Sequence, residues 1–381
     1  MRCLYELRIK YEYTNDKYVS SVYNRSMKTY TKTLFFAISV LFLSACSLGS
    51  GNDGGIYRSD DGGKTFSPKN QAENNKTIDA VDVLSLAVNP QNGREVYLGT
   101  KTNGIFKSGD GGELWRQLKV SEATPIKVYS MVLDQFDPKI IYAAAVLGGR
   151  GKIMKSADAG EVWKEIYTEP ADGSLVLSLA LNPQNSQNIF AGTDQGQILS
   201  SEDGGETWRS VFWTREKKAV YRIAYDNFDT NTIYFVIFQS GVLRTADGGA
   251  NFEELKQKAK LADFYETGEG LQNPVSIKTD PARAGWVYIG TSDGLLRSKD
   301  KGDNWEMIKT LNRAEEYNIR SIDVNPANSD ELVCTAAQTF YKSNDGGVNW
   351  FPIQSNSNRT LEIVEYDPQN PEVIYVGLNK R

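Results

Sequence analysis

One eight-residue pattern occurs seven times in the chain: Ser or Thr, any residue, Asp, any residue, Gly, two further residues, and then Trp or Phe. Successive copies begin 44 to 53 residues apart. Their first residues are Ser59, Ser108, Ser156, Ser201, Thr245, Ser298 and Ser343. Repeats of this length and regularity are typical of propellers and solenoids, in which each repeat forms one small structural unit.

The residues of the pattern predict a self-supporting turn between two strands. Glycine allows the positive φ of a tight turn, and the Asp and Ser side chains can hydrogen-bond to the turn's own backbone. The aromatic residue begins the returning strand, where burial of roughly 150 to 250 Å² anchors it. Seven equivalent carboxylates cannot all form one active site, so we interpret them as structural. They are Asp61, Asp110, Asp158, Asp203, Asp247, Asp300 and Asp345.

This pattern resembles the Asp-box, or BNR repeat, of sialidases, sortilin-like receptors and photosystem II assembly factor propellers. The last of these is the nearest in size and topology, and the resemblance covers residues 54–381. It implies a single seven-bladed ring that serves as a protein-binding scaffold. An Arg-Ile-Pro motif typical of sialidases is missing. Xyloglucanase-type hydrolases use two propellers where this resemblance accounts for one, so we expect no enzymatic activity.

The residues between the boxes predict three further strands in each repeat. The first repeat has apolar Val83 to Val88, the turn Asn89-Pro90, the strand Val96 to Thr100, and a third strand that enters the box at Ser108. β-branched and aromatic residues interrupted by Gly, Pro, Asn and Asp favour short strands throughout. The sequence therefore predicts an all-β fold made of four-stranded blades.

The two ends of the repeat region complement each other. After the seventh box, Leu361 to Tyr366 and Val373 to Gly377 supply a first and a second strand. At the other end, Gly55 to Ser59 and the first box supply a third and a fourth. We therefore predict that the termini share the seventh blade, which pairs strand edges that would otherwise be open.

Composition excludes several classes of function. The chain has 43 basic and 48 acidic residues, a net charge of −5, so nucleic acid is not an expected partner. It has no histidine, the commonest zinc ligand and general base, which argues against zinc catalysis and a Ser-His-Asp triad. We expect no metal, no cofactor and no disulfide, and Cys334 is predicted to be a buried apolar residue.

The N-terminal region predicts export and lipidation. Residues 27–46 combine Met27, Lys28 and Lys32 with an apolar run and end in Leu43-Ser44-Ala45-Cys46, which resembles a bacterial lipobox. The apolar run is too short for the roughly 20 residues that span a bilayer. Residues 1–26 are interpreted as an upstream extension and residues 47–53 as a tether. We expect Cys46 to carry lipid and the propeller to lie outside the cytoplasm.

Two classes of function stay open at this point. The leading hypothesis is a monomeric, lipid-anchored scaffold that binds or assembles other envelope or membrane proteins. The alternative is a glycan-binding protein or a glycoside hydrolase, which would need two carboxylates roughly 5 to 10 Å apart.

The candidate partner-binding residues lie where the repeats diverge. Arg222 replaces a Ser found at the equivalent first-strand position of five other repeats, and the connection 256–273 is unusually long. We predict that the partner binds the rim opposite the boxes and that positive charge there favours an acidic surface. The candidate residues are Trp213, Arg215, Lys217, Lys218, Arg222, Phe264, Tyr265, Arg320 and Arg150.

Overall fold

The computed structural model describes residues 54–122, 125–170, 173–255, 260–261, 271, 273–292, 294–308 and 318–380. The expected extension, signal peptide and tether, with Cys46, lie outside these residues, and so do Phe264 and Tyr265. The roles predicted for these residues therefore stay predictions.

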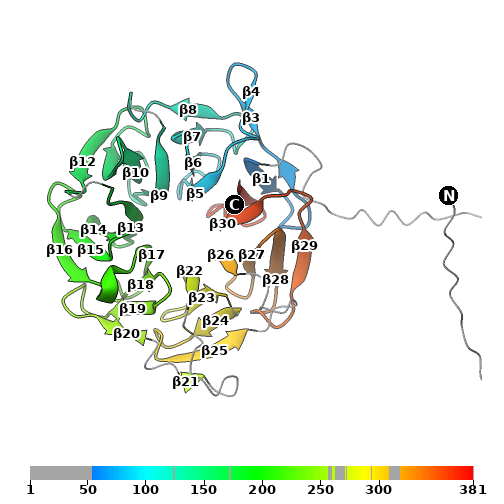
Figure 1. Ribbon diagram of the computed structural model, residues 1–381. Helices are drawn as coiled ribbons and strands as arrows, with labels where there is room; N and C mark the ends of the chain where they lie inside the picture. Colours follow the sequence, from blue (N-terminus) through cyan, green and yellow to red (C-terminus); the bar gives the residue numbers. More distant parts are fainter. Residues whose placement is uncertain are drawn as a thin grey trace, which may run out of the picture. The chain divides into compact units, whose positions relative to one another are not determined.

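Seven antiparallel sheets of the four-stranded blade type form a ring (Figure 1). We number the blades 1 to 7 in the order of their first strands. Blades 1 to 3 are β5 (Val83–Val88), β6 (Val96–Thr100), β7 (Ile105–Ser108) and β8 (Arg116–Leu118); β9 (Lys127–Leu133), β10 (Ile141–Leu147), β11 (Arg150–Ser156) and β12 (Lys164–Thr168); and β13 (Val176–Asn182), β14 (Asn185–Thr193), β15 (Gln197–Ser201) and β16 (Arg209–Trp213).

Blades 4 to 6 follow the same order. They are β17 (Val220–Tyr225), β18 (Ile233–Ile237), β19 (Gly241–Thr245) and β20 (Glu253–Glu254); β22 (Pro274–Thr279), β23 (Val287–Thr291), β24 (Leu295–Ser298) and β25 (Asn304–Ile308); and β26 (Ile319–Val324), β27 (Leu332–Ala336), β28 (Thr339–Ser343) and β29 (Phe351–Gln354). The short β21 (Lys260–Leu261) pairs parallel to β25, and β3 (Gln71–Ala72) and β4 (Lys76–Thr77) form a separate hairpin.

Blade 7 is shared by the two ends of the chain, as the sequence predicts. Its strand order is β30 (Thr360–Tyr366), β31 (Ile374–Asn379), β1 (Ile56–Ser59) and β2 (Ser67–Pro68). β1 and β31 are antiparallel, with Ile56 opposite Gly377 and Ser59 opposite Ile374. The third strand of this blade therefore pairs with a second strand more than 300 positions away in the sequence, and the ring closes without an open edge.

The second strands are the most deeply buried part of the blades. All five residues of β6, β18, β23 and β27 are buried, because apolar side chains on both faces pack against the neighbouring blades. Cys334 lies on β27, and burial raises the pKa of its thiol. Among the described residues it forms no disulfide. The prediction of a buried, apolar Cys334 is confirmed.

Each box is closed by its own Ser or Thr and Asp side chains. In the box of blade 3, the Gly205 N–H donates to Ser201 Oγ at 2.8 Å, and Ser201 Oγ donates to Asp203 Oδ1 at 2.8 Å. The Thr207 N–H and hydroxyl donate to the two oxygens of the same carboxylate at 2.9 and 2.6 Å. These hydrogen bonds hold the pKa of Asp203 down at about 2. The carboxylate is thus engaged within its own turn.

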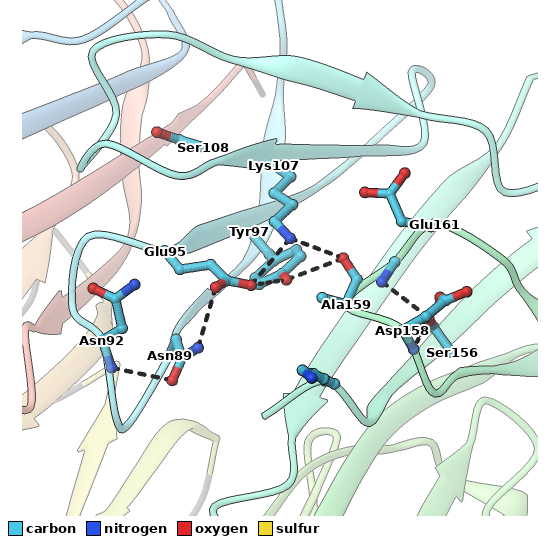
Figure 2. A network of polar contacts seen from close by, with 12 residues as sticks. Asn89, Asn92, Glu95, Tyr97, Lys107, Ser108, Ser156, Asp158, Ala159 and Glu161 are labelled. Carbon is cyan, nitrogen blue, oxygen red and sulfur yellow. Dashed lines mark hydrogen bonds and ion pairs between the residues drawn. The ribbon is translucent and has the colours of Figure 1, made fainter. Parts of the chain in front are cut away.

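A cation on the third strand joins most boxes to the preceding blade. Lys107 Nζ donates to the Ala159 carbonyl of the next box at 3.1 Å, pairs with Glu95 Oε1 at 3.1 Å, and lies 5.3 Å from the centre of the Tyr97 ring (Figure 2). Equivalent bonds from a third-strand cation to the next box start from Arg58, Lys155, Arg244, Arg297 and Lys342. The boxes therefore connect blades as well as close hairpins.

The ring has two different rims. The boxes lie beside the turns between first and second strands, where the Gly111 N–H donates to the Arg94 carbonyl at 2.7 Å; we call this the box rim. Turns between second and third strands meet the blade-to-blade connections on the other side, where the Gly104 N–H donates to the Ile126 carbonyl at 3.0 Å. We call this the loop rim. In the described part of the chain, no helix is long and apolar enough to cross a membrane.

Candidate functional site

A channel with a cavity volume of about 450 Å³ is lined by the seven first strands, which face the middle of the ring in Figure 1. Its lining extends from Arg320, near the loop rim, to Pro183 and Pro281 in turns of the box rim. Cavities of roughly 300 to 1,000 Å³ are of the size that binds small ligands. The channel is therefore large enough to receive part of a binding partner.

The first strands around the channel differ in charge from blade to blade. One first-strand position lies opposite Tyr97, Tyr142, Phe190 and Tyr234 of the second strands in blades 1 to 4, and holds Ala87, Val132, Ala180 and Ala224. The same position holds Lys278, Asp323 and Glu365 in blades 5 to 7. We call these three residues the inner trio. Three consecutive blades thus place charges where the repeat otherwise needs only a small apolar side chain.

Within the inner trio, Asp323 is fully hydrogen-bonded. Lys278 Nζ lies 2.7 Å from Asp323 Oδ1, and the backbone N–H groups of Val324 and Tyr366 donate to its two oxygens at 2.9 and 2.8 Å. Glu365 has no hydrogen bond or ion pair with any described residue. Burial, helped by the negative charge of Asp323, raises the pKa of Glu365 to about 7, although the positive charge of Lys278 acts to lower this pKa.

The channel mouth at the loop rim holds a second charged layer. Arg320 Nη1 lies 3.4 Å from Glu362 Oε2, and the buried Arg320 Nε has no hydrogen-bond partner among the described residues. Arg222 Cζ lies 5.9 Å from the centre of the Tyr221 ring. Burial raises the pKa of Tyr221 to about 12, and the charges of Arg222 and Arg320 both act to lower it. Both guanidinium groups are therefore within electrostatic reach of one phenol.

Arg222 occupies a position whose usual residue joins blades. The equivalent Ser178 donates to the Val220 carbonyl of the next blade at 3.0 Å, and Ser276 donates to the Ile319 carbonyl at 2.9 Å. Arg222 makes no such bond; its Nη1 donates to the Tyr221 carbonyl at 2.9 Å, and none of the described carboxylates pairs with it. Blade 4 thus loses a blade-joining hydrogen bond and presents a cation to the channel mouth.

Exposed aromatic side chains also lie on the loop rim near blade 4. Phe238 is 52% exposed, and its ring centre lies 6.1 Å from that of Tyr221. Trp213, at the end of β16, is 51% exposed. Lys218 Nζ donates to the carbonyl of Gln239, next to Phe238, at 3.3 Å. Trp213, Lys218, Tyr221, Arg222 and Phe238 are called the blade 4 patch below.

A second cavity, of about 500 Å³, lies beside this patch at the junction of blades 3 and 4. Trp213 and Arg215 line it together with Ile237, Val242 and Phe252. The 3-10 helix η1 (Arg215–Lys217) leads from Trp213 to the first strand of blade 4. Arg215 is 86% exposed, with Glu254 at the outer limit of ion pairing, 4.0 Å away.

The structure brings together only some of the residues predicted from the sequence. Trp213 and Arg215 line the outer cavity, whereas Arg222 and Arg320 line the channel mouth. Lys217 is exposed on η1, and Lys218 lies just after it. Arg150 begins β11 in blade 2 and is part of neither cavity lining. The sequence reasoning missed Tyr221, Phe238, Glu362 and the inner trio.

The described residues offer no site of the kind that holds a metal ion. Within them, no group of three or more Cys, Asp and Glu side chains has a suitable arrangement. The box carboxylates accept hydrogen bonds from their own turns, as Asp203 does.

Comparison with known proteins identifies the repeat and the fold. The family model of sortilin (Sortilin-Vps10; sortilin, neurotensin receptor 3) matches residues 151–283. A search of curated proteins for sequence relatives found no match.

Solved structures share the propeller fold at low sequence identity. The GH74 enzyme of Niastella koreensis is 18% identical with a TM-score of 0.63, over 78% of this chain and 51% of that chain. YCF48 from Cyanidioschyzon merolae is 13% identical with a TM-score of 0.59, over 78% and 95%. YCF48 bound to D1 peptide is 12% identical with a TM-score of 0.57, over 88% and 100%.

The extracellular domain of BT4673 from B. thetaiotaomicron is also similar, with 15% identity and a TM-score of 0.58, over 78% of this chain and 37% of that chain. The chain spans about half the length of the GH74 enzyme that it matches. These identities show a common fold, which hosts both enzymes and other proteins. The seven boxes, the family model and the shared fold together make this protein a seven-bladed β-propeller with Asp-box repeats similar to those of sortilin.

Proposed function

We propose that this protein is a binding scaffold for other proteins of the cell envelope and that its partner docks on the loop rim over blade 4. The proposal rests on the position of Arg222. A cation replaces a blade-joining serine at the channel mouth, next to Tyr221, whose ring packs on the exposed Phe238, and Trp213 is exposed elsewhere on the same rim. A side chain that costs a hydrogen bond between blades needs another role, and the neighbouring aromatic residues are of the kind enriched at protein interfaces.

The charges favour an acidic segment as the partner surface. The whole chain has a net charge of −5, yet Arg222 and Arg320 lie at the channel mouth and Lys218 lies on the same rim. Glu362 pairs with Arg320 and Glu216 with Lys218, which leaves Arg222 as the unpaired cation among these described residues. A local positive region on an acidic protein attracts an acidic partner and orients it before contact. The YCF48 structure with D1 peptide supports a protein partner as the class of ligand, because the bound chain there is a peptide on the same fold.

The proposal includes export and a lipid anchor. Cys46 would carry the lipid, residues 1–26 would be absent from the mature protein, and residues 47–53 would connect the lipid to a monomeric propeller. The extracellular domain of BT4673 offers support, because a similar propeller there lies outside the cell.

A glycoside hydrolase is the second candidate, favoured by the carboxyl group of Glu365. Its raised pKa suits a general acid, and Asp323 is a second carboxylate close enough to influence it. Against this role, Asp323 already accepts three hydrogen bonds and cannot act freely as a base or nucleophile. Release of reducing sugar from polysaccharides, lost in Glu365→Gln, would establish the hydrolase and refute the scaffold.

Photo-crosslinking in the native host tests the docking surface. The photoreactive residue p-benzoylphenylalanine replaces Phe238 on the loop rim or, as a matched control, Phe136 on the box rim, which is 59% exposed. We expect a defined protein adduct from the Phe238 position and none from the Phe136 position. Adducts from Phe136 alone, or from neither position, would contradict docking on the loop rim.

A further inference from the structure

We propose that the inner end of the channel is a binding site for a cationic group, the ammonium or guanidinium of a basic side chain, and that this group pairs with the carboxylate of Glu365. The inference rests on the proposed function, since the basic side chain would belong to a partner segment that enters from the loop rim. It adds a specific requirement: the acidic partner segment must carry a Lys or Arg inside the channel.

The position of the inner trio is the first support. Ala87, Val132, Ala180 and Ala224 show that the repeat packs well here with small apolar side chains. Charged side chains at such a position cost desolvation energy, and a charged pair is often no more stable than an apolar replacement. The charges of blades 5 to 7 are therefore better explained by a ligand than by packing.

The second support is the difference between the two carboxylates. Asp323 receives Lys278 Nζ and two backbone N–H groups, so its charge is balanced. Glu365 receives no donor from the described residues, although it lines the channel. A carboxyl group in this state is stabilised either by a proton or by a cation from outside. A basic ligand side chain supplies that cation.

Lys278 and Asp323 are the charged groups that shift the pKa of Glu365. On one side β26 contributes Asp323, and beyond it β22 contributes Lys278. On the other side β5 contributes Leu84, Ser85 and Leu86, none of which titrates. On β30 itself, Tyr366 follows in sequence with a raised pKa, and Glu362 lies towards the mouth. Across the channel stand Tyr221 and Arg222 of blade 4, whereas Arg320 lies on the adjacent β26 and pairs with Glu362. With Glu365 ionised, the inner trio has one cation and two anions, and a ligand cation restores neutrality.

The layers of the channel match a segment with charges of both signs. Glu362 and Glu365 are three residues apart on β30, so the mouth and the inner trio are separated by roughly 10 Å along the strand. The mouth carries Arg222 and the Arg320–Glu362 pair and is net positive, whereas the inner trio is net negative when Glu365 is ionised. A partner segment with an acidic residue at the mouth and a basic residue deeper in the channel satisfies both layers.

Isothermal titration of the full chain with two short peptides tests this site. The probes are acetyl-Gly-Lys-Gly-amide and the same peptide with norleucine, which keeps the methylene chain and removes the ammonium. We expect the lysine peptide to bind roughly tenfold more tightly at pH 8 than at pH 6, because Glu365 ionises between them with a pKa of about 7. The norleucine peptide should bind weakly and without pH dependence.

Glu365→Gln should weaken binding of the lysine peptide at least tenfold at pH 8 and remove the pH dependence of this binding. The control Glu122→Gln removes an exposed carboxylate paired with Lys119, far in sequence from β30, and should bind both peptides as the wild type does. Equal binding of the two peptides, no binding of either, or a Glu365→Gln variant that retains the preference for lysine would overturn the cation site. Those results leave crosslinking at Phe238 unaffected, so failure of this site and failure of the proposed function are distinguishable.

Discussion

At the scale of single residues, one position of the repeat has different roles in different blades. Ser178 and Ser276 use it to join their blade to the next, and Arg222 uses it to place a cation at the channel mouth. Two residues further along the strand, Ala180 and Ala224 occupy the position at which blade 7 has Glu365. Residues that leave the repeat at a structurally useful position are therefore the best indicators of function.

The box carboxylates should control stability in acid. The pKa of Asp203 is held at about 2, below its ordinary value of 3.8, by hydrogen bonds from Thr207 and Ser201. A lowered pKa in the folded state contributes stability that is present above about pH 4 and is lost as the pH falls through about 2. Asp203→Ala should lower the melting temperature at pH 7 and flatten its fall between pH 4 and pH 2, measured by differential scanning fluorimetry.

Partner capture should be unaffected by the same change. Asp203 lies in a box, on the rim away from the blade 4 patch, and its oxygens are engaged in the turn. An Asp203→Ala variant with an unchanged melting curve and lost capture would show that the carboxylate binds the partner.

Glu365 should affect stability in the opposite direction. Its pKa in the folded protein is about 7, above the ordinary value of 4.5, so the stability linked to its protonated form is complete below about pH 4.5 and is lost as the pH rises through 7. Glu365→Gln keeps the shape and cannot ionise. We expect the melting temperature of the wild type, and not that of this variant, to fall between pH 5 and pH 8. An equal fall in melting temperature for both proteins would contradict the raised pKa.

At the scale of elements, the junctions between blades use two kinds of contact. Six third strands carry a cation that donates to the next box, as Lys155 does to the Gly204 carbonyl at 2.8 Å. Blade 3 has Ser200 at this position. Its junction with blade 4 is instead packed with aromatic rings, among them Phe190 and Phe235, whose centres are 5.4 Å apart. An apolar junction replaces a polar one beside the outer cavity.

Removal of residues 361–381 should expose an edge of the sheet. The deletion takes away β31 and most of β30, so β1 keeps only the short β2 as a neighbour. An unpaired edge promotes association of chains. We expect a sharp fall in soluble yield and melting temperature, with oligomers in size-exclusion chromatography. A monomer that melts like the full chain would contradict the closure of the ring by blade 7.

Most of the fold could be predicted from the sequence because every element is repeated. The box gives the third and fourth strands, and apolar runs such as Val96 to Thr100 give the second. The shared blade follows because Ile374 to Asn379 and Ile56 to Ser59 each lack the other half of a repeat. The fold is thus encoded locally, seven times over.

The site could be predicted only in part, because it depends on contacts between repeats. Arg222 stands out since five other blades have Ser at its position, and comparison of the position of Glu365 across the repeats would have revealed the inner trio in the same way. Phe238 carries no such signal, since an apolar residue after a buried strand is ordinary. Its exposure, and the separation of Arg222 from the outer cavity, follow from how the blades curve around the channel.

At the scale of the whole molecule, the proposal joins a lipid anchor, an acidic ring and a positive channel mouth. The protein has a net charge of −5, and in the described part of the chain the blade 4 patch combines cations with exposed aromatic rings on the loop rim. A tether from a lipidated Cys46 would hold the ring near a membrane.

The anchor is tested by Cys46→Ala. A thiol is the group that forms the thioether to the lipid, and a second acyl chain is needed for stable attachment. We expect the variant to lose its partition into detergent extracts of membranes or to accumulate unprocessed, as seen by immunoblotting. A variant that partitions and migrates like the wild type would rule out lipidation at Cys46.

The most direct test of the account is the affinity of the crosslinked partner for two double variants of the full chain. Trp213→Ala with Arg222→Glu alters the blade 4 patch, and Phe136→Ala with Lys139→Glu makes the same kinds of change on the box rim. We predict at least a tenfold higher dissociation constant for the first, about 1.4 kcal/mol, with an unchanged melting temperature, and wild-type affinity for the second. Unchanged affinity of the first variant, or an equal loss in both, would contradict docking on the loop rim over blade 4.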